Sequence, residues 1–91
     1  MPTKAKLTQK FLDKLQEESA EIIQAVSKIR RFGPDNKHPD RQETNKQEFL
    51  NELEDFLALL GALEHLEYIN LEKSPPNIAK KLQALFHEDQ Q

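Results

Sequence analysis

The 91-residue chain contains no cysteine and only two glycines. The absence of cysteine excludes disulfide bonds, thiolate zinc sites and a cysteine nucleophile. The scarcity of glycine and of β-branched residues disfavours a sheet protein. The composition, 36% hydrophobic and 32% charged, is instead typical of amphipathic helices, and the length suits one small domain with a modest core.

Two classes of partner are disfavoured by what the sequence lacks. No apolar run approaches the roughly 20 residues that span a bilayer, so no membrane partner is expected. Residues 1–6 lack the apolar segment of a secretion signal, which makes a cytoplasmic protein the expectation. The net charge of −3 gives no electrostatic basis for binding nucleic acid, because a phosphate lattice attracts a basic surface.

Apolar residues at helical spacing predict a first helix over about residues 6–32. They recur at steps of three, four or seven, and they are Leu7, Phe11, Leu15, Ile22, Val26 and Ile29. Gly33 and Pro34 then stop the helix. The polar residues 33–44 form a connecting loop that is long for a helical hairpin and leaves room for a function.

Thr44 and Gln47 form a capping-box pattern that starts a second helix, expected over about residues 45–70. Its apolar positions cover more than half of the circumference, and they are Phe49, Leu50, Leu53, Phe56, Leu57, Leu59, Leu60, Leu63 and Leu66. Because one partner helix cannot cover so wide a surface, a homodimer or homotetramer is expected. Ser74 and two prolines start a third helix over about residues 75–87.

Two acid pairs lie within or beside these apolar surfaces. With about 100° per residue, Glu18 falls inside the apolar arc of the first helix and Glu21 on its flank. Glu52 and Asp55 fall among the leucine directions of the second helix. In an antiparallel hairpin, Glu21 lies about 16 Å before the first helix ends and Asp55 about 15 Å after the second begins, so the pairs meet at one level.

Four clustered carboxylates require cations or protons. Two carboxylates about 4 Å apart repel by roughly 4 kcal/mol at an effective dielectric constant near 20. None of His38, His65 and His87 has a glutamate three residues earlier, as a di-iron bundle requires. An all-oxygen cluster therefore predicts Mg²⁺, with Mn²⁺ as the alternative. The expected metal ligands are Glu18, Glu21, Glu52 and Asp55.

The acidic residues also form a family motif. Residues 17–21 and 52–55 together resemble the EExxE…ExxD signature of MazG-like, all-α nucleoside triphosphate pyrophosphohydrolases. Residues 25–33 are similar to the AxxKxxRFG stretch that is common in short members of that family. Family domains usually have four or more helices. The resemblance therefore implies an all-α bundle in which antiparallel helices are completed by oligomerisation.

The resemblance implies Mg²⁺-dependent cleavage of a nucleoside triphosphate or deoxynucleoside triphosphate to the monophosphate and pyrophosphate. The four acids would hold the metal ions, and Glu17 would orient the attacking water or support the ligand shell. Lys28 would contact a phosphate or pair with an acid. Arg31 and Lys14 are further candidates for substrate contact, although Arg31 points away from the acids on an ideal helix and Lys14 can pair with Glu18. For Glu17 and the three basic residues, an ordinary surface role is the alternative.

Two other functions also fit parts of the sequence. A non-catalytic helical oligomerisation or interaction module explains the wide apolar surface of the second helix, but it does not explain acids inside the apolar arcs. A metal-binding or nucleotide-binding regulator without turnover would keep the metal ligands and would not need a water-orienting glutamate.

Overall fold

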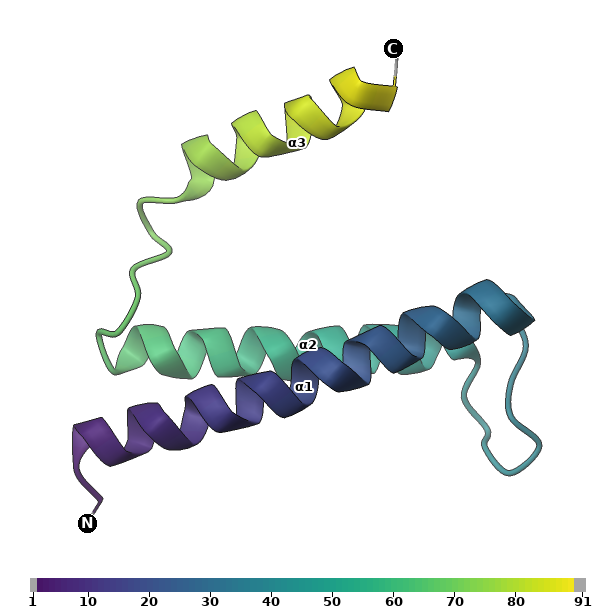
Figure 1. Ribbon diagram of the computed structural model, residues 1–91, viewed down its shortest axis with the longest axis horizontal. Helices are drawn as coiled ribbons and strands as arrows, with labels where there is room; N and C mark the ends of the chain where they lie inside the picture. Colours follow the sequence, from purple (N-terminus) through teal and green to yellow (C-terminus); the bar gives the residue numbers. More distant parts are fainter. Residues whose placement is uncertain (1, 90–91) are drawn as a thin grey trace.

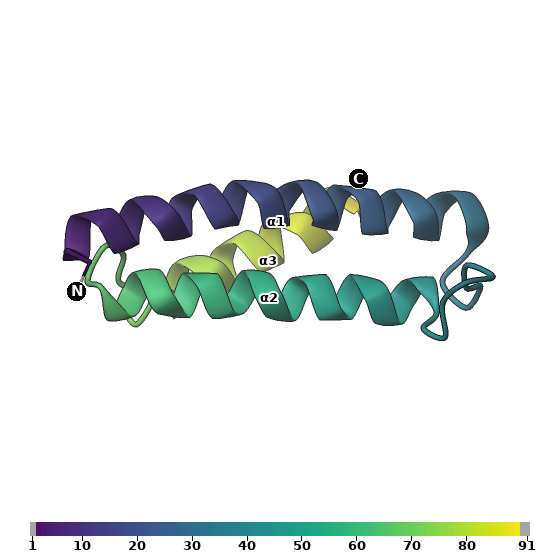
Figure 2. The same ribbon diagram turned by 90° about the horizontal axis from the view of Figure 1, so that it is seen from below.

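The computed structural model describes residues 2–89, which contain three helices: α1 (Lys4–Phe32), α2 (Asn45–His65) and α3 (Pro75–Asp89). The helices α1 and α2 run antiparallel as a hairpin, and α3 lies apart from it (Figure 1). Seen from below, α1 and α2 lie alongside one another over most of the length of α2 (Figure 2). Residues 2–89 contain no strand, which confirms the all-α fold class.

The ends of α1 are set by local hydrogen bonds. The Thr3 hydroxyl accepts the backbone N–H of Lys6 at 3.1 Å, so the helix begins slightly before the predicted residue 6. At the other end Gly33 adopts φ 89° and donates its N–H to the Ile29 carbonyl at 2.8 Å. A positive φ is readily available to glycine, and the helix ends where the sequence predicts.

The capping box at the start of α2 is formed as expected. The Thr44 hydroxyl accepts the N–H of Gln47 at 3.1 Å, and the Gln47 side chain accepts the N–H of Thr44 at 2.7 Å. Asn45 joins this turn to the end of α1, because its side chain donates to the Gly33 carbonyl at 3.0 Å and its N–H to the Asn36 carbonyl at 2.8 Å. These bonds hold the connecting loop against both helices.

The C-terminal end of α2 differs from the prediction. The helix ends at His65, several residues short of the predicted end, because Glu67 adopts φ 63°. The Glu67 N–H donates to the Glu64 carbonyl at 2.9 Å and the Tyr68 N–H to the Leu63 carbonyl at 3.0 Å, which is a Schellman motif. Glycine usually marks this motif, and a glutamate gives no such signal in the sequence.

Replacing Glu67 by glycine is expected to stabilise the protein by about 0.5–1 kcal/mol, because a left-handed conformation costs an L-residue roughly 1–2 kcal/mol and the flexibility of unfolded glycine offsets part of the gain. Thermal unfolding followed by circular dichroism measures this as a higher Tm. Glu67→Ala is the control, since it also removes the exposed 3.8 Å ion pair with Lys4 but keeps the strained backbone. A glycine variant no more stable than the alanine variant contradicts the prediction.

The hairpin buries little apolar surface. Among residues 2–89, the buried apolar residues are Ala25 and Leu63. Large apolar side chains are exposed on all three helices and on the connection between α2 and α3, and they are Ile23, Val26, Phe32, Leu50, Leu57, Tyr68, Leu71, Ile78, Leu82, Leu85 and Phe86. The last four belong to α3, which packs against neither α1 nor α2.

No helix within residues 2–89 combines the length and the apolar character needed to cross a bilayer.

Candidate metal centre

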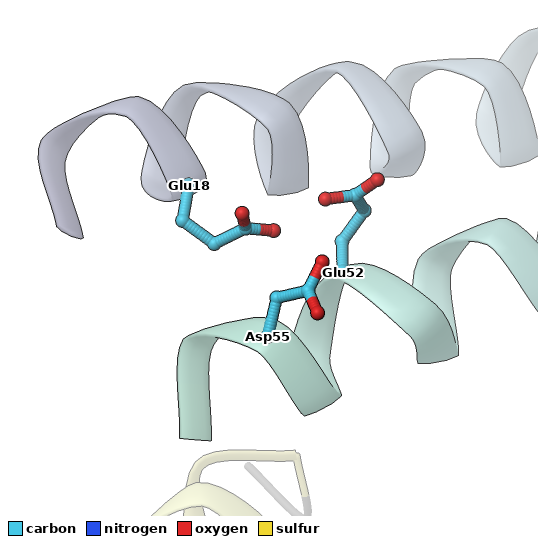
Figure 3. A group of neighbouring side chains, drawn as sticks. All are labelled: Glu18, Glu52 and Asp55. Atoms are coloured by element: carbon cyan, nitrogen blue, oxygen red, sulfur yellow. The ribbon is translucent and has the colours of Figure 1, made fainter. Parts of the chain in front are cut away.

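Three carboxylates meet between the two helices of the hairpin. Glu18 extends from α1, while Glu52 and Asp55 extend from α2 one turn apart (Figure 3). One oxygen atom from each lies within 4.8 Å of the other two. The antiparallel arrangement therefore brings these acids to one level, as the helix lengths predict.

Two oxygen atoms of this cluster are buried without a hydrogen-bond partner. Glu18 is only 9% exposed, Glu52 is half-buried and Asp55 is exposed. The buried oxygens are Glu18 Oε1 and Glu52 Oε2, and within residues 2–89 neither has a donor. Ionised carboxylates only accept hydrogen bonds, so the two groups cannot bond to each other without a proton. A buried carboxylate oxygen without a partner is costly, so these two oxygens call for a proton, a cation or an ordered water.

The electrostatics of Glu18 show the same requirement. The pKa of the Glu18 carboxyl is raised from 4.5 to about 8. The largest cause of this higher pKa is the hydrogen bond that the protonated carboxyl shares with Glu52, followed by burial and then by the negative charges of Glu52 and Glu21. Metal-free protein therefore keeps a proton on Glu18 at neutral pH.

The donor set fits a hard divalent cation. All three groups offer carboxylate oxygen, and the cluster contains no nitrogen or sulfur donor. Mg²⁺ and Mn²⁺ prefer such oxygen ligands, and a cation would provide the partner that Glu18 Oε1 and Glu52 Oε2 lack. Because metal binding needs ionised ligands, it would release the proton from Glu18.

The other acids of the first motif lie at the rim of this cluster. Glu17 and Glu21 are exposed, and both line a cavity of about 320 Å³ that also contains Glu18, Asp55 and Lys14. The negative charge of Glu21 acts on Glu18, although Glu21 is not part of the three-oxygen group. The ion pairs of residues 2–89 do not include one between Lys14 and Glu18.

The basic residues of the motif lie in two different places. Lys28 is half-buried, and its Nζ lies 3.5 Å from Oε2 of Glu48. The guanidinium of Arg31 instead lies over the ring of Phe32, 5.3 Å from its centroid, and Arg31 lines an outer surface with Arg30. Lys28 thus lies along the line of the acids on α1, whereas Arg31 lies away from it, as the ideal helix predicts.

The sequence interpretation did not include Glu48 and Arg41. Glu48 pairs with both Lys28 and Arg41, and its side chain is only 14% exposed. Together with Glu21 and Glu52, these residues line a cavity of about 190 Å³. Glu48 precedes Glu52 by one helical turn, so its spacing was a usable signal. No periodicity in the sequence indicates Arg41, because it lies in the loop.

Comparisons of the chain with protein-family models, with curated proteins and with solved structures found no match. Support for a function therefore comes from the acidic motif and from the arrangement of its side chains. That arrangement contains a cluster able to bind a divalent cation, with basic side chains farther along the same face of the hairpin.

Proposed function

We propose that this chain is a MazG-like, Mg²⁺-dependent nucleoside triphosphate pyrophosphohydrolase, which cleaves a nucleoside or deoxynucleoside triphosphate to the monophosphate and pyrophosphate. The observation that supports it best is the pair of buried, unpartnered oxygens on Glu18 and Glu52 beside Asp55. Acids on a solvated helix surface would have water as a partner, whereas these two oxygens lack one that a divalent cation would provide. Mn²⁺ would serve the same ligands.

Each acid has a role in this proposal. Glu18, Glu52 and Asp55 would hold the cation, and Glu21 would complete its surroundings from the rim. A bound divalent cation supplies Lewis-acid chemistry and offsets the charge of the triphosphate. Glu17, exposed in the same cavity, would accept a hydrogen bond from the attacking water and so orient it toward phosphorus.

The basic side chains would position the phosphates. Lys28 would give up its ion pair with Glu48 and bind a phosphate oxygen instead. Lys14 would contact the phosphate chain at the other end of the metal cavity. Arg31 has no such role in the proposal, because its guanidinium lies over Phe32.

Pyrophosphate release from a panel of nucleoside and deoxynucleoside triphosphates in Mg²⁺ tests this function. The expected result is one pyrophosphate and one monophosphate per nucleotide, with no reaction in EDTA. Release of single phosphate groups would contradict cleavage between the α- and β-phosphates. Nucleotide binding without any product would favour a regulator, and neither binding nor turnover would favour an interaction module.

We also propose that the chain forms a homodimer or homotetramer. Leu50 and Leu57 of α2 are 57% and 62% exposed, and they lie two turns apart on one side of the helix. The apolar stripe of α3 is also exposed, and α3 packs against neither helix of the hairpin. A second copy of the chain would cover this surface.

Leu57→Glu is expected to shift the protein toward monomer, because a charge at a buried apolar interface is costly. Sedimentation equilibrium at matched concentrations measures the shift. Asn51→Glu is the control, since it adds the same charge at an exposed position on another side of α2. A wild-type protein that sediments as a monomer, or equal association of both variants, contradicts the proposed assembly.

A further inference from the structure

A third cavity lies at the loop end of the hairpin, outside the acid cluster. It encloses about 370 Å³, and its walls are mostly apolar. Phe32 comes from the end of α1, His38 and Pro39 from the loop, and Asn45 from the start of α2. The volume is within the range of small-molecule sites, which begin at about 300 Å³.

The cavity is formed by a loop that hydrogen bonds hold in place. Asn45 donates to the carbonyls of Asn36 and Gly33, and Lys46 donates its N–H to the Pro34 carbonyl at 2.9 Å. Asn45 itself is 5% exposed, so its bonds are shielded from water. A ligand would therefore meet a preformed wall at Asn36 and Asn45, which lowers the cost of ordering this part of the loop on binding.

Shared residues connect this cavity with the acid cluster. Glu21 lines both the metal cavity and the smaller cavity beside it. Lys28 lines that smaller cavity and also the loop-end cavity. Glu21, Lys28 and Phe32 follow one another at steps of seven and four, so they lie on one face of α1, about 16 Å apart from first to last. The three cavities thus follow one line along the hairpin.

The chemical character changes along this line. It begins with the carboxylates that would hold a cation, continues with the cations of Lys28 and Arg41 around Glu48, and ends at the rings of Phe32 and His38. A nucleoside triphosphate has the complementary order of metal-binding phosphates, ribose and a flat aromatic base. Aromatic side chains stack on bases of every kind, and amide groups can hydrogen-bond to their edges.

We infer that the loop-end cavity between Phe32 and the loop 36–39 binds the base of the nucleotide, while Lys28 and Arg41 lie beside the α-phosphate and ribose. This inference rests on the proposed function, and it assigns the recognition of the base to a part of the chain outside the acidic motif. Inorganic triphosphate, which has no base, would use the acid cluster but leave the loop-end cavity empty.

Phe32→Ala tests the base site. The KM for ATP, GTP, CTP or UTP, whichever nucleotides are hydrolysed, is expected to rise about tenfold or more, since stacking of a base on one aromatic ring has an effect of this size. The KM for inorganic triphosphate is expected to stay unchanged, as is kcat for each substrate. Phe32→Tyr keeps the ring and is expected to retain wild-type kinetics. Ile23→Ala is the matched control, because Ile23 is an exposed apolar residue of α1 outside the cavity.

The outcomes separate this inference from the proposed function. Nucleotide hydrolysis with equal KM values for wild type and Phe32→Ala overturns the base site and leaves the enzyme in place. If no nucleotide is hydrolysed, calorimetry with the α,β-methylene analogues of the same nucleotides and Mg²⁺ decides. Binding that Phe32→Ala weakens and Ile23→Ala does not supports the base site while refuting turnover. Absence of binding to the wild type overturns both.

Discussion

Replacing Glu18 by glutamine is expected to lower pyrophosphate release by more than about a hundredfold, with the helices intact. Changes to groups that only support a metal ligand already cost about 10–100-fold in affinity or activity, so loss of the most buried ligand should cost at least as much. Glutamine keeps the shape of the side chain but removes the charge that would attract the cation. Initial rates at saturating Mg²⁺ and circular dichroism of the same sample measure both parts of the prediction.

The acids of α2 provide companion variants and a control. Glu52→Gln and Asp55→Asn are expected to give losses of similar size, because their oxygens belong to the same group. Glu54→Gln makes the same chemical change on the same helix, at an exposed position outside the cluster. It should keep wild-type turnover. Equal activity of Glu18→Gln and Glu54→Gln would show that the cluster does not hold the catalytic metal.

If Glu18 is a metal ligand, its replacement should affect the stability of metal-free protein differently from an ordinary core substitution. Removing a buried polar group that is well paired destabilises a protein, because its partner is left alone. Glu18 has an oxygen without a partner, so neutralising it should stabilise metal-free protein above neutral pH. Lower turnover together with higher stability of the metal-free variant is the combination expected when the replaced residue is a metal ligand.

Most helix boundaries could be predicted from local sequence. Thr44 with Gln47 starts α2, and Gly33 ends α1, because caps depend on a few adjacent residues. The end of α2 could not be predicted, because Glu67 adopts a left-handed conformation in which glycine is usual. The apolar pattern of α3 also could not predict that this helix lies apart from the hairpin, because an apolar stripe does not indicate which surface covers it.

The sequence predicts the side of the helix on which each acid lies better than it predicts how deeply each side chain is buried. Helical geometry correctly placed Glu18 on the apolar side of α1, and the structure makes it one of the most buried charged residues described. The same geometry placed Glu21 on the flank, where its side chain is exposed and outside the three-oxygen group. The ion pair of Arg41 with Glu48 depends on the path of the loop, which residue spacing does not determine.

Metal-free protein is expected to lose stability as the pH rises from about 4.5 to about 8. The pKa of Glu18 is 4.5 when unfolded and about 8 when folded, so between these values the folded state holds a proton that the unfolded state has lost. Rising pH then favours the unfolded state, and the stability present below pH 4.5 is lost through pH 8. Urea unfolding in EDTA across this range measures the fall in stability.

Mg²⁺ is expected to reverse this loss, and to raise Tm more at pH 8 than at pH 5.5, because its ligands must be ionised. Sodium chloride at matched ionic strength controls for screening of the acid charges. Glu18→Gln should remove the fall in stability and most of the gain from Mg²⁺, whereas Glu54→Gln should keep both. If stability in EDTA follows the same course with pH in the wild type and in Glu18→Gln, then Glu18 ionises without cost and the cluster needs no cation.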